Sequence, residues 1–119
     1  MAREIETKCI HLEEEENSIN HYGAISYPIY QSATYAHPGV GQSTGYDYSR
    51  LQNPTREHLE KTVASLENGI DALAFSSGMA AITLMMELFK PGDHLIVDAD
   101  LYGGSIRLFN HVSEKNGIE

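Results

Sequence analysis

The sequence has no tryptophan, a single cysteine, and 8 basic against 17 acidic residues in its 119 positions, for a net charge of −9. A lone Cys9 cannot form an internal disulfide and offers a zinc ion no second thiolate, which favours a reducing, cytoplasmic setting. The acidic excess argues against a general nucleic-acid binder or a protein of anionic membrane surfaces, because both partners would repel it. No apolar run approaches the roughly 20 residues that cross a bilayer.

Other absences narrow the possible chemistry further. The 6 histidines form no H-E-x-x-H motif and have no metal-ligand spacing with Cys9 or a carboxylate, so we expect no metal site. The N-terminus lacks the apolar segment of a signal peptide. It carries instead the acidic run Glu13–Glu16, which is typical of a solvated face or a frayed arm.

Two regions of different character follow one another along the chain. Residues 17–52 are rich in Tyr, Ser, Gly and Pro and show no sustained helical or alternating period, so residues 1–52 are predicted to form an extended N-terminal arm. Asn53-Pro54-Thr55 then supplies an N-cap and a first-turn proline, and Asn68-Gly69 supplies a stop. A helix between these signals is expected to open a second region, 53–119.

The rest of that region alternates between short apolar runs and helical patterns. Ala72–Phe75 and His94–Val97 are short and apolar, which predicts two buried strands. Helices are expected over Met79–Phe89 and Ser105–Asn116. Such alternation indicates a parallel α/β sheet, but two strands leave a sheet edge and apolar helix faces uncovered. We therefore expect residues 53–119 to be the incomplete start of a larger α/β domain that does not fold alone.

Three segments could carry chemistry. Ser76-Ser77-Gly78-Met79 joins a predicted strand to a helix, where free backbone amides and the helix dipole favour a phosphate or carboxylate; a plain helix cap is the alternative. Tyr102 precedes two glycines that permit close approach, so its ring could lie against a planar ligand or simply pack on the next helix.

Tyr48 and Arg50 make up the third candidate. A guanidinium beside phenol hydroxyls can clamp a phosphate, because all of these groups donate hydrogen bonds to an anion. The alternative is a surface arginine that precedes a capped helix.

Taken together, the motifs Y-x-Y-S-R-x-x-N-P-T (46–55), S-S-G-M-A-A (76–81) and D-L-Y-G-G-S (100–105) resemble the Cys/Met-metabolism enzymes that depend on pyridoxal 5′-phosphate (PLP). This family includes the cystathionine γ-synthases, the cystathionine γ- and β-lyases and the methionine γ-lyases. Residues 27–35 are similar to the family's N-terminal arm. The resemblance implies the N-terminal part of a fold-type-I, aminotransferase-like α/β domain in a dimer of dimers.

The resemblance also implies roles for individual residues. Ser77, Gly78 and Met79 would hold the PLP phosphate. Tyr102 would stack on the pyridine ring and take part in proton transfer. Tyr48 and Arg50 would reach the phosphate in the neighbouring subunit's active site, which suits an arm whose place is against another chain.

One requirement of the family is missing from these residues. Such enzymes need a lysine that bonds to the cofactor and a carboxylate against its ring nitrogen. No lysine here stands in the family's Ser-x-Thr-Lys context; the lysines are Lys8, Lys61, Lys90 and Lys115. We therefore expect a fragment of an enzyme for β/γ-elimination or γ-replacement on sulfur amino acids. The alternative is a non-catalytic truncated product that binds phosphate or pairs with full-length subunits.

The branch of the family is indicated by two positions. Methionine γ-lyases tend to carry cysteine where this chain has Gly104, and O-acetylhomoserine sulfhydrylases commonly carry glutamine where it has Met79. The run 102–109 is more similar to a cystathionine γ-synthase or γ-lyase, and we favour these activities.

Overall fold

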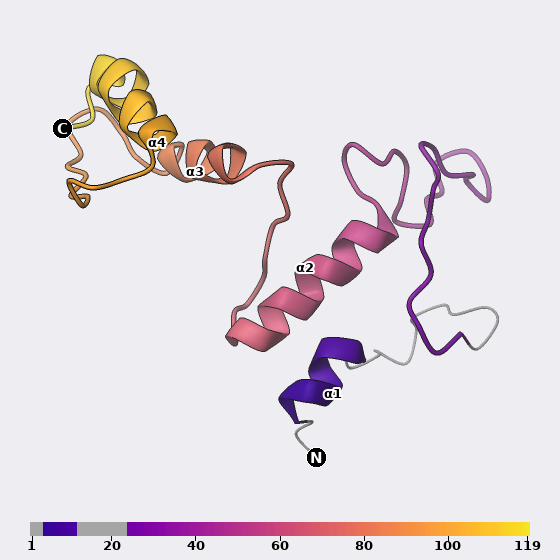
Figure 1. Cartoon of the computed structure of the whole chain (residues 1–119). Coiled ribbons are helices and arrows are strands. Elements are labelled where there is room, and N and C mark those ends of the chain that lie inside the picture. The colour runs from indigo at the N-terminus through magenta and orange to yellow at the C-terminus, as the bar shows by residue number, and fades with distance from the viewer. Residues whose placement is uncertain (1–3, 12–23) are drawn as a thin grey trace. The chain divides into compact units, whose positions relative to one another are not determined.

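The computed structural model describes residues 4–11 and 24–119 (Figure 1). The chain divides into two compact units, Met1–Ala74 and Phe75–Glu119, and each is described by itself. The acidic run Glu13–Glu16 lies outside the described residues.

The first unit begins with a short helix that sequence patterns did not predict. Helix α1 (Ile5–Ile10) has no side-chain cap, although Glu6 in its first turn and Lys8 in its last turn suit the helix dipole. An isolated helix of this length is unstable in water, so its contact with helix α2 is what supports it.

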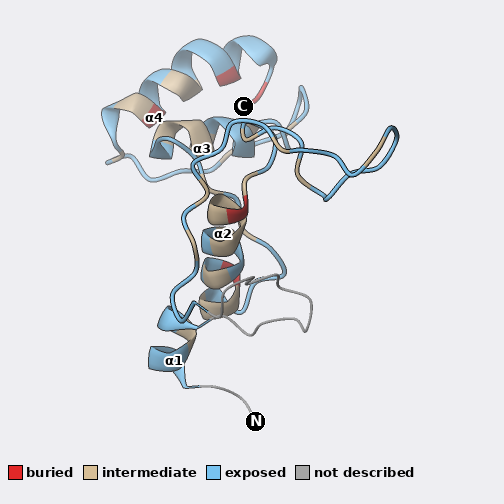
Figure 2. Ribbon diagram, turned by 90° about the vertical axis from the view of Figure 1, so that its right-hand side faces the viewer, coloured by how far each residue is buried: buried red, intermediate tan, exposed pale blue. Residues whose placement is uncertain are grey.

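Helix α2 (Pro54–Glu67) forms where its start and stop signals predict it. The Asn53 side chain accepts a hydrogen bond from the Thr55 amide, and Pro54 occupies the first turn, where its missing N–H costs nothing. The helix ends at Asn68, which adopts the left-handed conformation with φ 54°. Ala64, which is 7% exposed, marks its buried face (Figure 2).

The preceding residues, 24–52, contain no helix and follow an irregular path, as expected. Their main regular feature is an antiparallel bridge between Thr34 and Tyr48. Around it, Tyr35 N donates to Asp47 O at 3.2 Å and Ser49 N donates to Ala33 O at 2.9 Å. These bonds join two stretches of the arm far apart in sequence.

The second unit contains helices α3 (Gly78–Met86) and α4 (Gly103–Leu108). The expected helix over residues 79–89 ends early, because Leu88 and Phe89 already donate to carbonyls only three residues back. The expected helix over residues 105–116 starts earlier, at Gly103. It continues as a π-helix, η1 (Phe109–Ser113), and a 3₁₀ turn, η2 (Glu114–Asn116), and Gly117 ends it at φ 81°.

The prediction of two buried strands is wrong for this chain. Within the described residues, neither 72–75 nor 94–97 belongs to a strand, and Leu73 and Ile96 are 64% and 95% exposed. A buried parallel strand needs neighbours along its edges and helices over its faces, and these residues do not supply them.

One contact has the pattern of a parallel strand pair. Glu119 N donates to Asp93 O at 2.9 Å, and Leu95 N donates to Glu119 O at 2.6 Å. A single residue thus bonds to two positions, two apart, on the other segment, as in a parallel ladder. Ile118 beside it is buried, at 9% exposure.

Candidate functional site

The start of helix α3 has the geometry of an anion site. Ser77 is the N-cap, and its Oγ accepts a hydrogen bond from Ala80 N at 3.1 Å. The hydroxyl can still donate its own proton. The amides of Gly78 and Met79 lie in the first turn, where helix geometry provides no carbonyl partner. Ser77 is therefore a helix cap, and a cap of this kind leaves two amides and a hydroxyl for an anion.

The Tyr102 ring and the Met79 side chain, from the start of α3, both lie close to Gly104. A Cβ placed on Gly104 would come within 2.5 Å of Tyr102 Cε1 and 3.0 Å of Met79 Sδ. Ser105, which is buried, directs its Oγ to the same sulfur at 3.8 Å. Tyr102 is 73% exposed, so its side chain is accessible to a ligand.

Tyr48 and Arg50 are brought together in the first unit. The Arg50 guanidinium carbon lies 5.0 Å from the centre of the Tyr48 ring, a cation–π distance. Among the described residues, neither the Tyr48 hydroxyl nor the Arg50 guanidinium has a hydrogen-bond or ion-pair partner. Both side chains are exposed, so their donors remain available.

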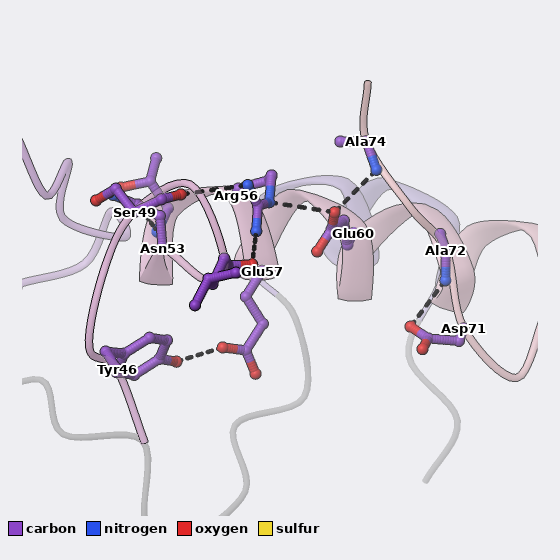
Figure 3. A network of polar contacts seen from close by, with 11 residues as sticks. Tyr46, Ser49, Asn53, Arg56, Glu57, Glu60, Asp71, Ala72 and Ala74 are labelled. Carbon is purple, nitrogen blue, oxygen red and sulfur yellow. Dashed lines mark hydrogen bonds and ion pairs between the residues drawn. The ribbon is translucent and has the colours of Figure 1, made fainter. Parts of the chain in front are cut away.

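The turn that carries this pair is held by hydrogen bonds from helix α2 (Figure 3). Arg56 donates to Ser49 O at 3.4 Å and to Leu51 O. Its Nε also lies 3.5 Å from a Glu60 carboxylate oxygen. Asn53 donates to Ser49 Oγ at 2.9 Å. Arg56 of α2 thus holds the backbone of this turn, and the cap residue Asn53 holds the side chain of Ser49.

A charged network connects the arm to helix α2. The Tyr46 hydroxyl donates to a Glu57 carboxylate oxygen, and Lys61 Nζ lies 2.6 Å from the other oxygen. The hydrogen bonds from Lys61 and Tyr46 lower the pKa of the Glu57 carboxyl. Burial and the bond to Glu57 raise the pKa of the Tyr46 phenol well above its ordinary value. Tyr46 therefore stays protonated and acts as a donor.

The Tyr27 and His58 rings add a second attachment. They are stacked with centroids 3.9 Å apart and planes within 6°. Burial, followed by the charge of Lys61, lowers the pKa of His58 from its usual 6.5. The neutral imidazole is favoured, which suits stacking against a neutral phenol.

The structure places the sequence-predicted residues in two groups. In the second unit, Met79 and Tyr102 meet at Gly104, and Ser77 and Gly78 precede Met79 at the start of α3; Tyr48 and Arg50 form a pair in the first unit. Sequence reasoning missed Arg56 and the donor side of Asn53. It also missed the packing role of Gly104; the paired glycines after Tyr102 were its one available signal.

Comparison with known proteins identifies the family that these features belong to. The sequence profile described as Cys/Met metabolism PLP-dependent enzyme matches residues 6–119. The chain belongs to this family. Its cofactor is PLP, and the predicted fold class, the fold-type-I PLP-enzyme architecture, is confirmed by the solved structures that the chain resembles.

Individual relatives include both synthases and lyases. The chain is 50% identical over 118 residues to the cystathionine γ-synthase/O-acetylhomoserine (thiol)-lyase of Bacillus subtilis, covering 99% of this chain and 31% of that protein. It is 55% identical over 97 residues to the cystathionine γ-lyase of the same organism, covering 82% and 26%. Among solved structures, the cystathionine γ-synthase of Xanthomonas oryzae in complex with cystathionine superposes with a TM-score of 0.84 and 36% identity, covering 99% and 30%.

The chain thus spans about a quarter to a third of these relatives' length, between 26% and 31%.

Within residues 4–11 and 24–119 there is no group of three or more His, Cys, Asp or Glu side chains arranged to hold a metal ion. No helix in the described part of the chain is long and apolar enough to span a membrane.

Proposed function

We propose that this chain supplies the phosphate-binding and ring-stacking residues of a PLP-dependent enzyme that acts on sulfur amino acids. The observation that carries this proposal is the meeting of the α3 N-terminus with Tyr102 at Gly104. Two unpaired amides and the Ser77 hydroxyl suit a phosphate monoester. An exposed aromatic ring beside them suits the planar pyridine of the same molecule.

The roles of the residues follow from what each can donate. Gly78 and Met79 offer backbone amides, and the fixed helix dipole strengthens their hold on a doubly charged phosphate. Tyr102 orients the pyridine ring by stacking, and its hydroxyl serves in proton transfer near the reacting carbon. When bound, PLP acts as the electron sink for elimination or replacement reactions.

Tyr48 and Arg50 would complete the phosphate site of a neighbouring subunit. Their unsatisfied donors are exposed at a turn that is fixed from behind by Arg56. A turn that is already held in place, with free donors, suits an anion from another molecule, because binding then costs little conformational entropy. The arm, residues 1–52, would then lie against the partner in a dimer of dimers.

The activity that fits best is that of a cystathionine γ-synthase or γ-lyase: β/γ-elimination or γ-replacement on a small amino-acid substrate, in the cytoplasm. Relatives of both kinds match this chain at about equal identity, 50% and 55%. Cystathionine is the ligand in one similar structure and L-serine in a similar cystathionine γ-lyase from Lactobacillus plantarum.

The test uses a chimera in which this chain replaces the aligned segment of the cystathionine γ-synthase/O-acetylhomoserine (thiol)-lyase of Bacillus subtilis. That protein supplies the remaining two-thirds of the chimera. The chimera should bind PLP, and Tyr102→Ala should weaken that binding. A folded chimera that takes up no PLP would contradict the proposal. Reading the coding sequence past Glu119 tests the enzyme against the non-catalytic alternative: a Ser-x-Thr-Lys in frame supports the enzyme, and a stop codon supports the alternative.

A further inference from the structure

The carboxamide of Asn53 makes more contacts than a helix cap requires. Its oxygen accepts the Thr55 amide at 2.9 Å, which is the capping bond. Its nitrogen lies within hydrogen-bond distance of Tyr30 O at 3.2 Å, Tyr35 Oη at 3.1 Å and Ser49 Oγ at 2.9 Å. Two N–H groups therefore serve three acceptors from two separate stretches of the arm.

The acceptors of Asn53 belong to two stretches of the arm that have further hydrogen bonds of their own. Thr55 Oγ1 accepts from Tyr30 N at 2.8 Å, so the backbone groups of Tyr30 are bonded to the N-cap and to the first turn of α2. Ser49 is bonded on its other side, because its amide donates to Ala33 O and its hydroxyl to Ser32 O. Asn53 thus connects residues 30–35 with the turn at Ser49.

Ser49 is the residue between Tyr48 and Arg50. The Arg50 guanidinium carbon lies 5.0 Å from the centre of the Tyr48 ring, so a shift of the Ser49 backbone would change the spacing of these two groups. The Ser49 backbone is held at its amide by Ala33 O and at its carbonyl by Arg56, and Asn53 holds the side chain of the same residue through its Oγ. Figure 3 shows Ser49, Asn53 and Arg56 converging on this turn.

We propose that Asn53 is a positioning residue that presents Tyr48 and Arg50 as a preformed pair to the cofactor phosphate of a neighbouring copy; this rests on the proposed function. Helix capping alone does not account for asparagine here. Serine or aspartate would cap α2 about equally well, but only a carboxamide caps and donates two hydrogen bonds from the same side chain.

The experiment separates capping from positioning in the chimera. Asn53→Ser and Asn53→Asp each keep a capping oxygen and remove both N–H donors. Gln52→Ala is the matched control, because Gln52 is exposed and is held here through its backbone amide. Dissociation constants are measured for PLP and for pyridoxal, which lacks the phosphate, and thermal unfolding is followed in parallel.

Positioning predicts a loss that depends on the phosphate. Asn53→Ser should weaken PLP binding about 2- to 13-fold, the range that one neutral hydrogen bond supports, and leave pyridoxal binding unchanged. Asn53→Asp should do the same or worse, because its carboxylate faces carbonyl and hydroxyl oxygens. Gln52→Ala should change neither constant.

Other results would overturn the positioning role. They are equal weakening of PLP and pyridoxal, loss of the folded chimera on Asn53→Ser, or an Asn53→Ser protein that binds both ligands like the control. Failure of the proposed function itself gives a different result, since the unsubstituted chimera would then show no preference for PLP over pyridoxal.

Discussion

Gly104→Ala tests the arrangement around Tyr102 most sharply. The added Cβ would lie 2.5 Å from Tyr102 Cε1, closer than two carbon atoms approach, and 3.0 Å from Met79 Sδ, a tight contact. Because Tyr102 is 73% exposed, its ring can rotate into solvent at little cost to folding. The cost should therefore fall on ligand stacking and not on stability.

The magnitude follows from the value of an aromatic pair. Correct stacking contributes about 0.5–1.5 kcal/mol beyond buried area, which corresponds to about a 2- to 13-fold change in the dissociation constant. The chimera's affinity for PLP should fall by that factor, and its affinity for pyridoxal should fall equally, because the ring is common to both ligands. Spectrophotometric titration measures both.

Gly103→Ala is the matched control. It lies in the same first turn of α4, and a Cβ there would meet no atom within 4 Å. Both substitutions replace a helical glycine by alanine, so their gain in helix propensity, about 0.5–1 kcal/mol, cancels in the comparison. If the two variants bind PLP alike, Gly104 does not set the position of the Tyr102 ring and the reasoning is refuted.

Three further outcomes follow from the structure. Arg50→Ala should weaken PLP binding by about 10- to 150-fold, the value of a hydrogen bond to a charged group, without weakening pyridoxal binding; unchanged PLP affinity would remove Arg50 from the phosphate site. Ser77→Asp keeps the cap of α3 but places a negative charge at the anion site. Helix content measured by circular dichroism should persist while PLP binding is lost, and retained PLP binding would contradict the site. Folding lowers the pKa of His58 and of Glu57, so each group stabilises the folded state at a pH above its unfolded pKa, 6.5 for His58 and 4.5 for Glu57. This stabilisation is lost as the pH falls below that value. The arm should therefore become more accessible to protease from about pH 6 downward, and His58→Phe should remove the upper part of that profile; a profile that does not change between pH 7 and 4 would argue against these contacts.

Local signals account for the parts of the fold that were predicted correctly. Helix α2 is bounded by an N-cap asparagine, a first-turn proline and a left-handed Asn68, all within a few residues of its ends. The start of α3 at Ser77 is similarly local. Such features act over one helical turn and can be identified from the sequence alone.

Features that depend on distant residues were harder to predict. The apolar runs at residues 72–75 and 94–97 favour strands, but a strand also needs partners to pair with, and in the described residues only Glu119 bonds to the second run in a strand-like way. Helix α1 depends on contact with α2, which no pattern in residues 5–10 reveals.

The candidate site shows the same division. The Ser77 cap at the start of α3 and the position of Tyr102 before two glycines could be anticipated from motif and position. The three acceptors around Asn53 could not, because Tyr30, Tyr35 and Ser49 are brought to it by the folded arm. A helix-start motif predicts the capping bond of the Asn53 oxygen, but it does not predict the acceptors of the Asn53 nitrogen.

A crystal structure of the chimera grown with PLP would show most directly whether the start of α3 and Tyr102 hold the cofactor. We expect the amides of Gly78 and Met79 to lie within hydrogen-bond distance of the phosphate oxygens and the Tyr102 ring to lie parallel to the pyridine. Tyr48 and Arg50 should reach the same phosphate from a neighbouring subunit. A phosphate bound away from the α3 N-terminus, or a Tyr102 ring turned away from the cofactor, would contradict this expectation.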